Sequence, residues 1–256
     1  MSDKYEGDER LKHIMKNYDS MKIGPDDAFS FHCTMCGKCC INREDIILNP
    51  YDLYRVAKAL NKTPAEVAAE YCDIYLGGSS KMVILRLKPV GAEKRCPLLK
   101  GKKCSVHSGK PTVCALYPLG RGFKSEIDDK RPFTEREIQY IYQKPSCGDR
   151  SEKHTVREWL EDFDFLTDEM YFKQWMQFVI DCGKAMRKIE ELSFFDLLNG
   201  IGNAILQSAY LNYTTEEPFM PQFEENTQRL RDLFGDMMPQ IYEYEKGKQK
   251  EGDDHG

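Results

Sequence analysis

The sequence predicts an α+β fold that is mostly helical, in which an irregular, cysteine-rich N-terminal domain with a short β-hairpin precedes a C-terminal helical bundle. Three observations predict it. Nine of the ten cysteines lie before Arg150. After residue 150, apolar residues recur at three- and four-residue steps, as one buried helix face requires. Between residues 91 and 121 the chain is dense in Gly, Pro, Lys and Cys and has few apolar residues to bury. We expect four parts: an N-terminal segment (1–28), a cysteine-cluster domain (29–150), a helical domain (151–246) and a disordered tail (247–256).

The N-terminal domain contains start signals for two helices and for strands. Asn49 can cap a helix whose first turn holds Pro50, after a short apolar strand or turn at residues 46–48. The stretch "TPAEVAAEYCDIYL" begins with a capping box of Thr and Glu, and Gly77 and Gly78 follow it, so we expect a second helix there. The aliphatic run "KMVILRLKPV" predicts a strand.

The helical domain begins at another capping box, formed by Thr155 and Glu158. The apolar face of the segment that follows is made by Trp159, Phe163, Leu166, Met170, Trp175, Phe178, Val179 and Cys182. Ser193 can cap a helix over "FFDLLNGIGNAILQSAYLNY", and a last helix is expected over residues 223–246. These signals predict a C-terminal bundle of about three helices.

The composition argues against several classes of protein. The 256 residues are 41% hydrophobic and 31% charged, as soluble globular chains are, and the net charge is −5. Nucleic-acid backbones attract proteins through dense positive charge, which this acidic chain does not have, so we do not expect nucleic acid as a partner. No apolar run is long enough to cross a bilayer, and the charged N-terminus lacks the apolar core of a signal peptide. We therefore expect a cytoplasmic protein with no membrane partner.

The spacing of the cysteines indicates metal ligands. The stretch "HCTMCGKCC" places four thiols close together, and a gap of two residues lets a tight turn aim two sulfur atoms at one ion. In a reducing cytoplasm such thiols more often bind metal than form disulfides. We therefore expect metal to staple the irregular domain. The predicted ligands are Cys33, Cys36, Cys39, Cys40, Cys96, Cys104, Cys114 and Cys147.

The adjacent residues Cys39 and Cys40 suggest how these ligands divide. Neighbouring side chains on an extended backbone point to opposite sides, so two adjacent thiolates seldom face one tetrahedral ion. We expect one of them at each of two sites, or at two metals of one larger cluster. Cys72 and Cys182 fall in predicted amphipathic helices and are interpreted as core packing. Eight cysteines then remain, the number that two four-thiolate sites need.

Four other side chains near the cysteines have simpler explanations than metal binding. His32 and His107 stand beside cysteines, where a histidine more often supports a ligand or lies at the surface than binds the ion itself. Asp45 and Asp52 follow the cysteine cluster, and helix capping and solvation explain them.

The cysteine spacing favours iron–sulfur over zinc and leaves both open. The pattern C-x2-C-x2-C with distant further cysteines resembles the opening of bacterial ferredoxin sequences, although the closing C-x3-C-P is absent. Zinc sites more often use two separated C-x2-C pairs, and no second pair occurs in the sequence. We therefore expect an iron–sulfur cluster, with the 4Fe-4S type as a candidate and zinc as the alternative.

The motifs "FHCTMCGKCC", "RCPLL", "KCSVHSGKPTVCALYPLG" and "PSCGDR" resemble the YkgJ family of cysteine-cluster proteins, also described as a zinc- or iron-chelating domain. The matching positions are Cys33, Cys36, Cys39, Cys40, Cys96, Pro97, Cys104, Pro111, Cys114, Pro118 and Cys147. Ala115 departs from the pattern, because many relatives have an arginine there. The resemblance covers the cysteine-rich half, and it implies a metal-binding protein. One branch of that family is named for flagellin lysine N-methylation and is associated with an iron–sulfur cluster.

Three functions follow as hypotheses. The first is a metal–thiolate protein whose cluster is structural or moves electrons. The second, implied by the resemblance alone, is an enzyme such as a protein-lysine methyltransferase, although the sequence has no strand and glycine loop of the usual kind for S-adenosylmethionine. The third is a zinc-stapled scaffold whose helical half binds a partner. The sequence identifies no catalytic residues, and the protein or redox partner is unknown.

Overall fold

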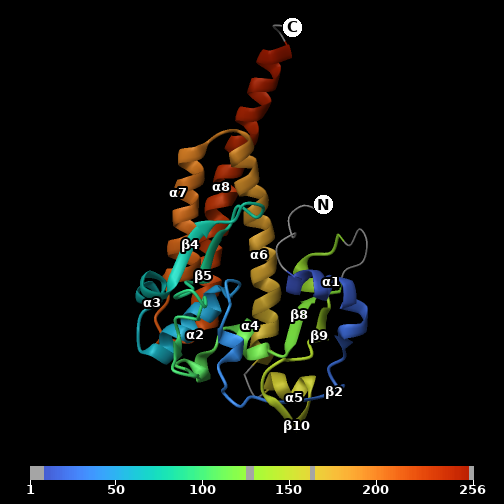
Figure 1. The fold of residues 1–256 in the computed structure, drawn as a ribbon. Coiled ribbons are helices and arrows are strands. Elements are labelled where there is room, and N and C mark those ends of the chain that lie inside the picture. Colours follow the sequence, from blue (N-terminus) through green and yellow to red (C-terminus); the bar gives the residue numbers. More distant parts are fainter. Residues whose placement is uncertain (1–8, 125–129, 162–164, 254–256) are drawn as a thin grey trace. The chain divides into compact units, whose positions relative to one another are not determined.

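The structure is a computed structural model that describes residues 9–124, 130–161 and 165–253 (Figure 1). It confirms the predicted fold class, with small antiparallel sheets in the N-terminal part and helices in the C-terminal part. The C-terminal helices are α6 (Phe165–Glu191), α7 (Phe195–Ile205) and α8 (Phe219–Asp253). None of the described helices carries an apolar stretch long enough to span a bilayer.

The chain divides into two compact units, and each unit is built from two separate stretches. Unit 1 consists of residues 1–39 and 112–173, and unit 2 consists of residues 40–111 and 174–256. The first crossing between the units falls between Cys39 and Cys40. Both units therefore draw on the cysteine-rich half and on the helical half. This division does not test whether residues 29–150 or 151–246 fold alone, so those domain bounds stay a prediction.

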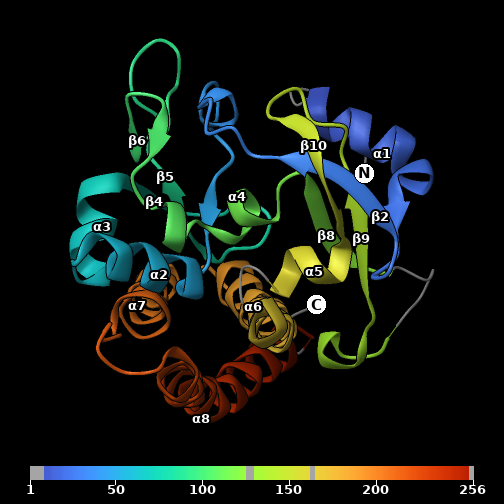
Figure 2. The same ribbon diagram turned by 90° about the horizontal axis from the view of Figure 1, so that it is seen from below.

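Unit 1 contains two small antiparallel sheets. Its strands are β1 (Lys22–Ile23), β2 (Ala28–His32), β8 (Leu119–Phe123), β9 (Ile138–Tyr142) and β10 (Asp149–Thr155). One sheet has the order β1-β9-β8, and in the other β10 pairs with β2, the two lying side by side in Figure 2. Its helices are α1 (Glu9–Met21), α4 (Thr112–Leu116) and α5 (Val156–Glu161), with a 3₁₀ turn at Phe133–Glu135.

The core of unit 1 forms around the indole of Trp159. The alternation of β2 turns Phe29 and Phe31 inward, and both rings meet Trp159 edge-on at centroid distances of 5.7 and 5.8 Å. The indole N–H donates to the carbonyl oxygen of Leu116 at 3.2 Å, which satisfies the polar end of the ring. The other buried members are Ala115, Leu119, Tyr140, Val156 and Leu160. This core fixes β2, at whose end the cysteine loop begins.

Unit 2 packs helices against a three-stranded sheet. The sheet contains β3 (Ile47–Leu48), β4 (Cys72–Leu76) and β5 (Val83–Leu87) in the order β3-β5-β4. The strands β6 (Leu99–Lys100) and β7 (Lys103–Cys104) form a separate hairpin. Its helices are α2 (Pro50–Leu60), α3 (Pro64–Tyr71), the later part of α6, α7 with a π-helical continuation at Leu206–Leu211, and α8. The largest fully buried side chains include Leu48, Leu53, Leu85, Phe178, Met186, Ile189, Ile205 and Phe223.

Most of the predicted helix starts are confirmed. Asn49 caps α2, with its side-chain oxygen accepting the N–H of Asp52 at 2.8 Å, and Pro50 stands in the first turn. Thr63 and Glu66 form the capping box of α3. The third box, at the start of α5, is also present, and the strand expected in "KMVILRLKPV" is β5. Local capping signals in the sequence were thus sufficient to find these elements.

The predicted helix over "TPAEVAAEYCDIYL" is too long. α3 ends at Tyr71, and Cys72 begins the strand β4, so the placement of Cys72 in an amphipathic helix is wrong. The cause is a partner further along the chain, because all five residues of β4 pair with β5, from Cys72 opposite Leu87 to Leu76 opposite Val83. Long-range pairing overrides the local helical preference of a short apolar run.

The second half also corrects three expectations. Ser193 does not cap a helix, because its φ is +60° and Phe194 occupies the N-cap position of α7. The segment before Ser193 forms two helices, α5 and α6, and Phe163 lies outside the described residues. The last helix is longer than expected: α8 begins at Phe219 and continues to Asp253, into the stretch where a disordered tail is predicted.

Candidate metal centre

None of the ten cysteines forms a disulfide in the structure. The two units divide them equally. Unit 1 holds Cys33, Cys36, Cys39, Cys114 and Cys147, and unit 2 holds Cys40, Cys72, Cys96, Cys104 and Cys182. Apart from Cys147 and Cys182, which are buried, these thiols are half-buried or exposed.

Three thiols of unit 1 lie on one tight loop after β2. The strand ends at His32, so Cys33 leaves the core directly into the loop. Met35 and Gly37 have φ values of +49° and +74°, and these left-handed residues coil the chain on either side of Cys36. A 3₁₀ turn at Lys38–Cys40 follows. The extended backbone assumed for Cys39 and Cys40 is therefore absent, yet the two residues still fall in different units.

Strand pairing brings the fourth thiol of unit 1 to this loop. Cys147 is followed by Gly148 and then by β10, whose Asp149 stands opposite His32 of β2. Gly148 has φ +67°, and a Cβ at this position would lie 2.4 Å from the carbonyl oxygen of His32. Only glycine allows this approach without a shift of the backbone. The motif "SCG" in the sequence thus positions Cys147 beside β2.

The three thiols of the loop lie close enough to Cys147 for their charges to affect its ionisation. Burial raises the pKa of Cys147, and the negative charges of Cys39, Cys36 and Cys33 raise it further. Tyr117 opposes them, because its phenol oxygen lies 3.5 Å from the sulfur of Cys147. The pKa of Tyr117 is itself raised, mainly by burial, so the phenol stays protonated and can donate to a Cys147 thiolate.

The loop is also prepared to hold a thiolate at Cys36. Backbone hydrogen bonds from Lys38 and then from Gly148 lower the pKa of this thiol, and Thr34 and the charge of Lys38 lower it further. Gly148 thus links the two thiols, because its backbone N–H donates to Cys36 and the residue itself directly follows Cys147. These supporting groups were not predicted from the sequence, and the glycines in "CGKCC" and "PSCGDR" are the signals that could have indicated a close approach of the backbone.

A second group of thiols gathers in unit 2. The backbone of Cys40 accepts the N–H of Cys96 at 2.8 Å, and the N–H groups of Asn42 and Arg43 donate to the chain just before Cys96. Cys104 stands in β7, opposite Leu99 of β6. The N–H of Leu99 in turn donates to the carbonyl of Cys96 at 3.1 Å. These backbone bonds place Cys40, Cys96 and Cys104 in one part of unit 2.

The three remaining cysteines, Cys72, Cys114 and Cys182, belong to β4, α4 and α6. Cys114 is half-buried on α4, next to Ala115 and Leu116 of the unit 1 core. Burial raises the pKa of Cys72 and of Cys182 to about 12, so both thiols resist ionisation. The buried position of Cys182 agrees with the interpretation that it packs rather than binds metal, whereas Cys72 is half-buried and stands opposite Leu87 of β5.

The four other candidate side chains also have structural partners. His32 is partly exposed, with Nδ1 3.4 Å from a carboxylate oxygen of Asp149. Burial lowers the pKa of His107 in unit 2. Asp45 pairs with Arg43 at 2.5 Å. Asp52 is 1% exposed, caps α2 and lies 3.1 Å from Arg55.

The donor set suits a thiophilic metal in its chemistry. Thiolate sulfur is a ligand that both zinc and iron–sulfur clusters accept in tetrahedral sets. Within the described residues, no three His, Cys, Asp or Glu side chains are arranged so that they could hold one metal ion. The thiols are therefore gathered without being closed around a common point, and holding an ion requires them to move together.

Comparison with known proteins agrees with this chemistry. Residues 32–148 match the model of the CxxCxxCC family, described as "Putative zinc- or iron-chelating domain". Neither the curated proteins nor the solved structures gave a match. The matched segment contains all eight cysteines predicted as ligands, and it excludes Cys182. Over residues 32–148, somewhat less than half of its length, the chain is thus similar to the CxxCxxCC family of zinc- or iron-chelating domains.

Proposed function

We propose that the protein is a cytoplasmic iron–sulfur protein, in which cysteine thiolates hold a cluster with a structural or electron-transfer role. Two observations support iron–sulfur rather than zinc: the C-x2-C-x2-C opening resembles that of ferredoxins, and a second C-x2-C pair is absent from the sequence. The family description, which names zinc or iron, is compatible with either metal. An electron-transfer role requires a protein redox partner, which we include in the proposal.

The observation that carries the proposal is the gathering of four thiols in unit 1. Cys33, Cys36 and Cys39 come from one loop and Cys147 comes from the segment just before β10, and the charges of the three loop thiols raise the pKa of Cys147. We assign these four to a first set of ligands. Cys40, Cys96 and Cys104 belong to a second set in unit 2, and Cys114 of unit 1 is the eighth proposed ligand. The boundary between units supports the division of Cys39 from Cys40.

The residues around the first set have defined tasks in this proposal. A bound cluster supplies one-electron chemistry, or simply neutralises and cross-links the thiolates. The backbone N–H groups of Lys38 and Gly148 stabilise the negative charge on Cys36. The phenol of Tyr117 orients the sulfur of Cys147. The aromatic core around Trp159 keeps the strand β2 fixed while the loop closes.

Anaerobic purification with iron, zinc and acid-labile sulfide analysis tests the proposal. We expect iron and sulfide together with broad visible absorption. Cys39→Ser should remove the metal of the first set and Cys40→Ser that of the second, while Cys182→Ser, the matched control, leaves the metal content unchanged. A protein that binds neither metal, or that loses metal equally in the Cys182 variant, contradicts the assignment.

Zinc is the second candidate, because the family description names it. In that case we expect a colourless protein with stoichiometric zinc and no sulfide. The zinc then holds the cysteine-rich segment together, the chain acts as a scaffold, and its helical half binds a protein partner. The lysine methyltransferase hypothesis rests only on the resemblance. A methyl-transfer assay with S-adenosylmethionine and a lysine-containing protein would support it only if the activity disappears with the Cys→Ser changes.

A further inference from the structure

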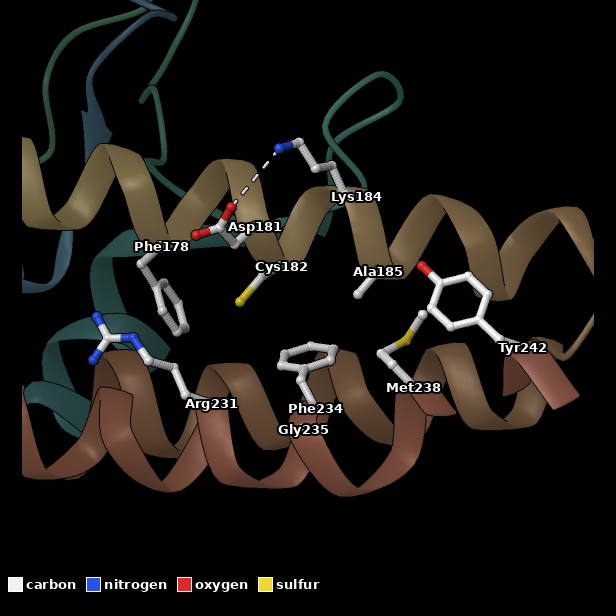
Figure 3. Close-up of a pocket in the computed structure, with 10 residues that line it drawn as sticks. All are labelled: Phe178, Asp181, Cys182, Lys184, Ala185, Arg231, Phe234, Gly235, Met238 and Tyr242. Carbon is white, nitrogen blue, oxygen red and sulfur yellow. Dashed lines mark ion pairs between the residues drawn. The ribbon is translucent and has the colours of Figure 1, made fainter. Parts of the chain in front are cut away.

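A groove lies between α6 and α8 in unit 2, outside the cysteine-rich segment. The two helices run side by side in Figures 1 and 2, and the groove has a volume of about 330 Å³. In Figure 3, Phe178, Cys182 and Ala185 turn from α6 toward α8, and Phe234 and Met238 turn from α8 toward α6. The volume is at the lower end of the range for small-molecule sites, about 300–1,000 Å³.

The floor of this groove is apolar and excludes charge. Cys182 is only 3% exposed, and burial raises the pKa of its thiol to about 12, so the sulfur carries no charge at neutral pH. Ala185 is buried beside it. An apolar chain can displace water from such a surface, whereas a charged group placed there would lose its hydration.

One end of the groove presents a cation that lacks an anion. The guanidinium of Arg231 lies over the ring of Phe178 at 6.0 Å, and a nitrogen lies 3.5 Å from the hydroxyl of Thr227. Within the described part of the chain, Arg231 forms no ion pair. Lys184, by contrast, lies 3.9 Å from Asp181, which also accepts a hydrogen bond from Gln177. A guanidinium presents a planar fork that suits a carboxylate, so Arg231 has capacity left for one.

Gly235 lines the same groove and keeps it open. Glycine is a poor residue for the interior of a long helix such as α8. Packing does not demand it, because a Cβ added here would meet nothing within 4 Å and the backbone is not left-handed. A larger side chain at this position would enter open space along the groove. No close contact to a described residue therefore accounts for this glycine, which is exposed where it lines the groove.

The geometry points to a binding site for an amphipathic monocarboxylate, whose aliphatic chain lies between α6 and α8 and whose carboxylate pairs with Arg231. Charge complementarity selects this occupant. The floor accepts an apolar chain, the unpaired guanidinium accepts one negative charge, and the Lys184–Asp181 pair is already neutral. This site is independent of the metal, because none of the groups that form it is a proposed metal ligand.

Isothermal titration calorimetry on the purified full chain tests the site, with decanoate as the probe below its micelle concentration. Decan-1-ol and decylammonium have the same chain without the carboxylate. We expect decanoate to bind and both analogues to bind at least about tenfold more weakly, since a hydrogen-bonded charge pair is lost. Arg231→Gln should weaken the affinity for decanoate by about tenfold or more, and Lys184→Gln should weaken it by less than about twofold.

Two glycine variants separate binding from folding. Gly235→Leu should fill the groove and abolish decanoate binding. Gly200→Leu is the matched control, because a Cβ on this exposed glycine of α7 also meets nothing within 4 Å but lies outside the groove. Circular dichroism must show that both variants are folded, and Arg231→Gln provides the independent test if Gly235→Leu is not.

Several results would overturn the assignment. They are no binding of decanoate by the unchanged chain, equal binding of decan-1-ol, or full binding by Gly235→Leu. A dimer that Gly235→Leu dissociates, without decanoate binding, would instead make a second copy of the chain the occupant and would also refute the carboxylate site.

Discussion

Gly148→Ala is the sharpest test of how the first set of thiols is assembled. The added methyl group meets two costs. An L-residue in the left-handed region is less stable than glycine by about 1–2 kcal/mol. The Cβ would also lie 2.4 Å from the carbonyl oxygen of His32, so the segment after Cys147 must move away from β2. Overpacking of this kind costs about 1–3 kcal/mol, which gives a total of about 2–5 kcal/mol.

Gly91→Ala is the matched control. Gly91 has φ +71°, but a Cβ there meets nothing within 4 Å. This variant should therefore lose only the stability that an L-residue in the left-handed region costs, about 1–2 kcal/mol. The difference between the two variants isolates the close approach of Gly148 to β2.

Urea unfolding followed by tryptophan fluorescence measures both losses. The chain has two tryptophans, Trp159 in the core of unit 1 and Trp175 in unit 2. A Trp175→Phe background leaves Trp159 to report on unit 1 alone. Metal analysis of the same proteins should show a loss for Gly148→Ala and retention for Gly91→Ala. If the two variants lose the same stability, or if Gly148→Ala keeps its metal, the account of Cys147 is refuted.

Three further predictions concern metal removal, a helix cap and a buried thiol. Chelation should expose residues 96–147 to protease before the C-terminal helices, as mass spectrometry of the fragments would show; simultaneous cleavage of both contradicts it. Thr63→Ala should cost about 1 kcal/mol in urea unfolding and Thr63→Ser much less. Hydrogen bonds from the backbone N–H and then from the hydroxyl of Thr63 lower the pKa of Glu66, so the stabilisation is present above the ordinary pKa of a glutamate and disappears as the pH falls through the folded value. The alanine variant keeps the backbone hydrogen bond, so it should lose only the part of this pH dependence that the hydroxyl supplies. Because burial raises the pKa of Cys182 to about 12, iodoacetamide should label it slowly at neutral pH and faster as the pH approaches that value, and rapid labelling of the folded protein at neutral pH would show that the thiol is not buried.

The sequence predicted what local chemistry determines. Asn49 and Thr63 cap their helices because the hydrogen bonds involved span only three residues. The strands β4 and β10 were missed, since each exists only by pairing with another segment. β10 carries the polar sequence "DRSEKHT", most of which is exposed, so it lacks the apolar alternation that predicts a strand.

The candidate site divides in the same way. The spacing of Cys33, Cys36 and Cys39 indicates a common loop, and the structure has one. The approach of Cys147 depends on the β10–β2 register, which no short motif encodes. Tyr117 was likewise invisible, because its phenol reaches the thiol only in the folded chain. The glycine after Cys147 was the one readable sign that backbone must pass closely there.

The interleaved units also constrain the order of events on the ribosome. Residues 1–39 are translated before residues 112–173, and unit 1 needs both stretches to assemble. The intervening residues 40–111 belong to unit 2. Unit 2 is completed later still, because its second stretch, residues 174–256, is translated after residues 112–173. The earliest cysteines are thus synthesised well before Cys147, the residue that closes their group. Nascent chains must either keep those thiols unoccupied or carry an ion on an incomplete set of ligands, so maturation is expected to follow translation rather than accompany it.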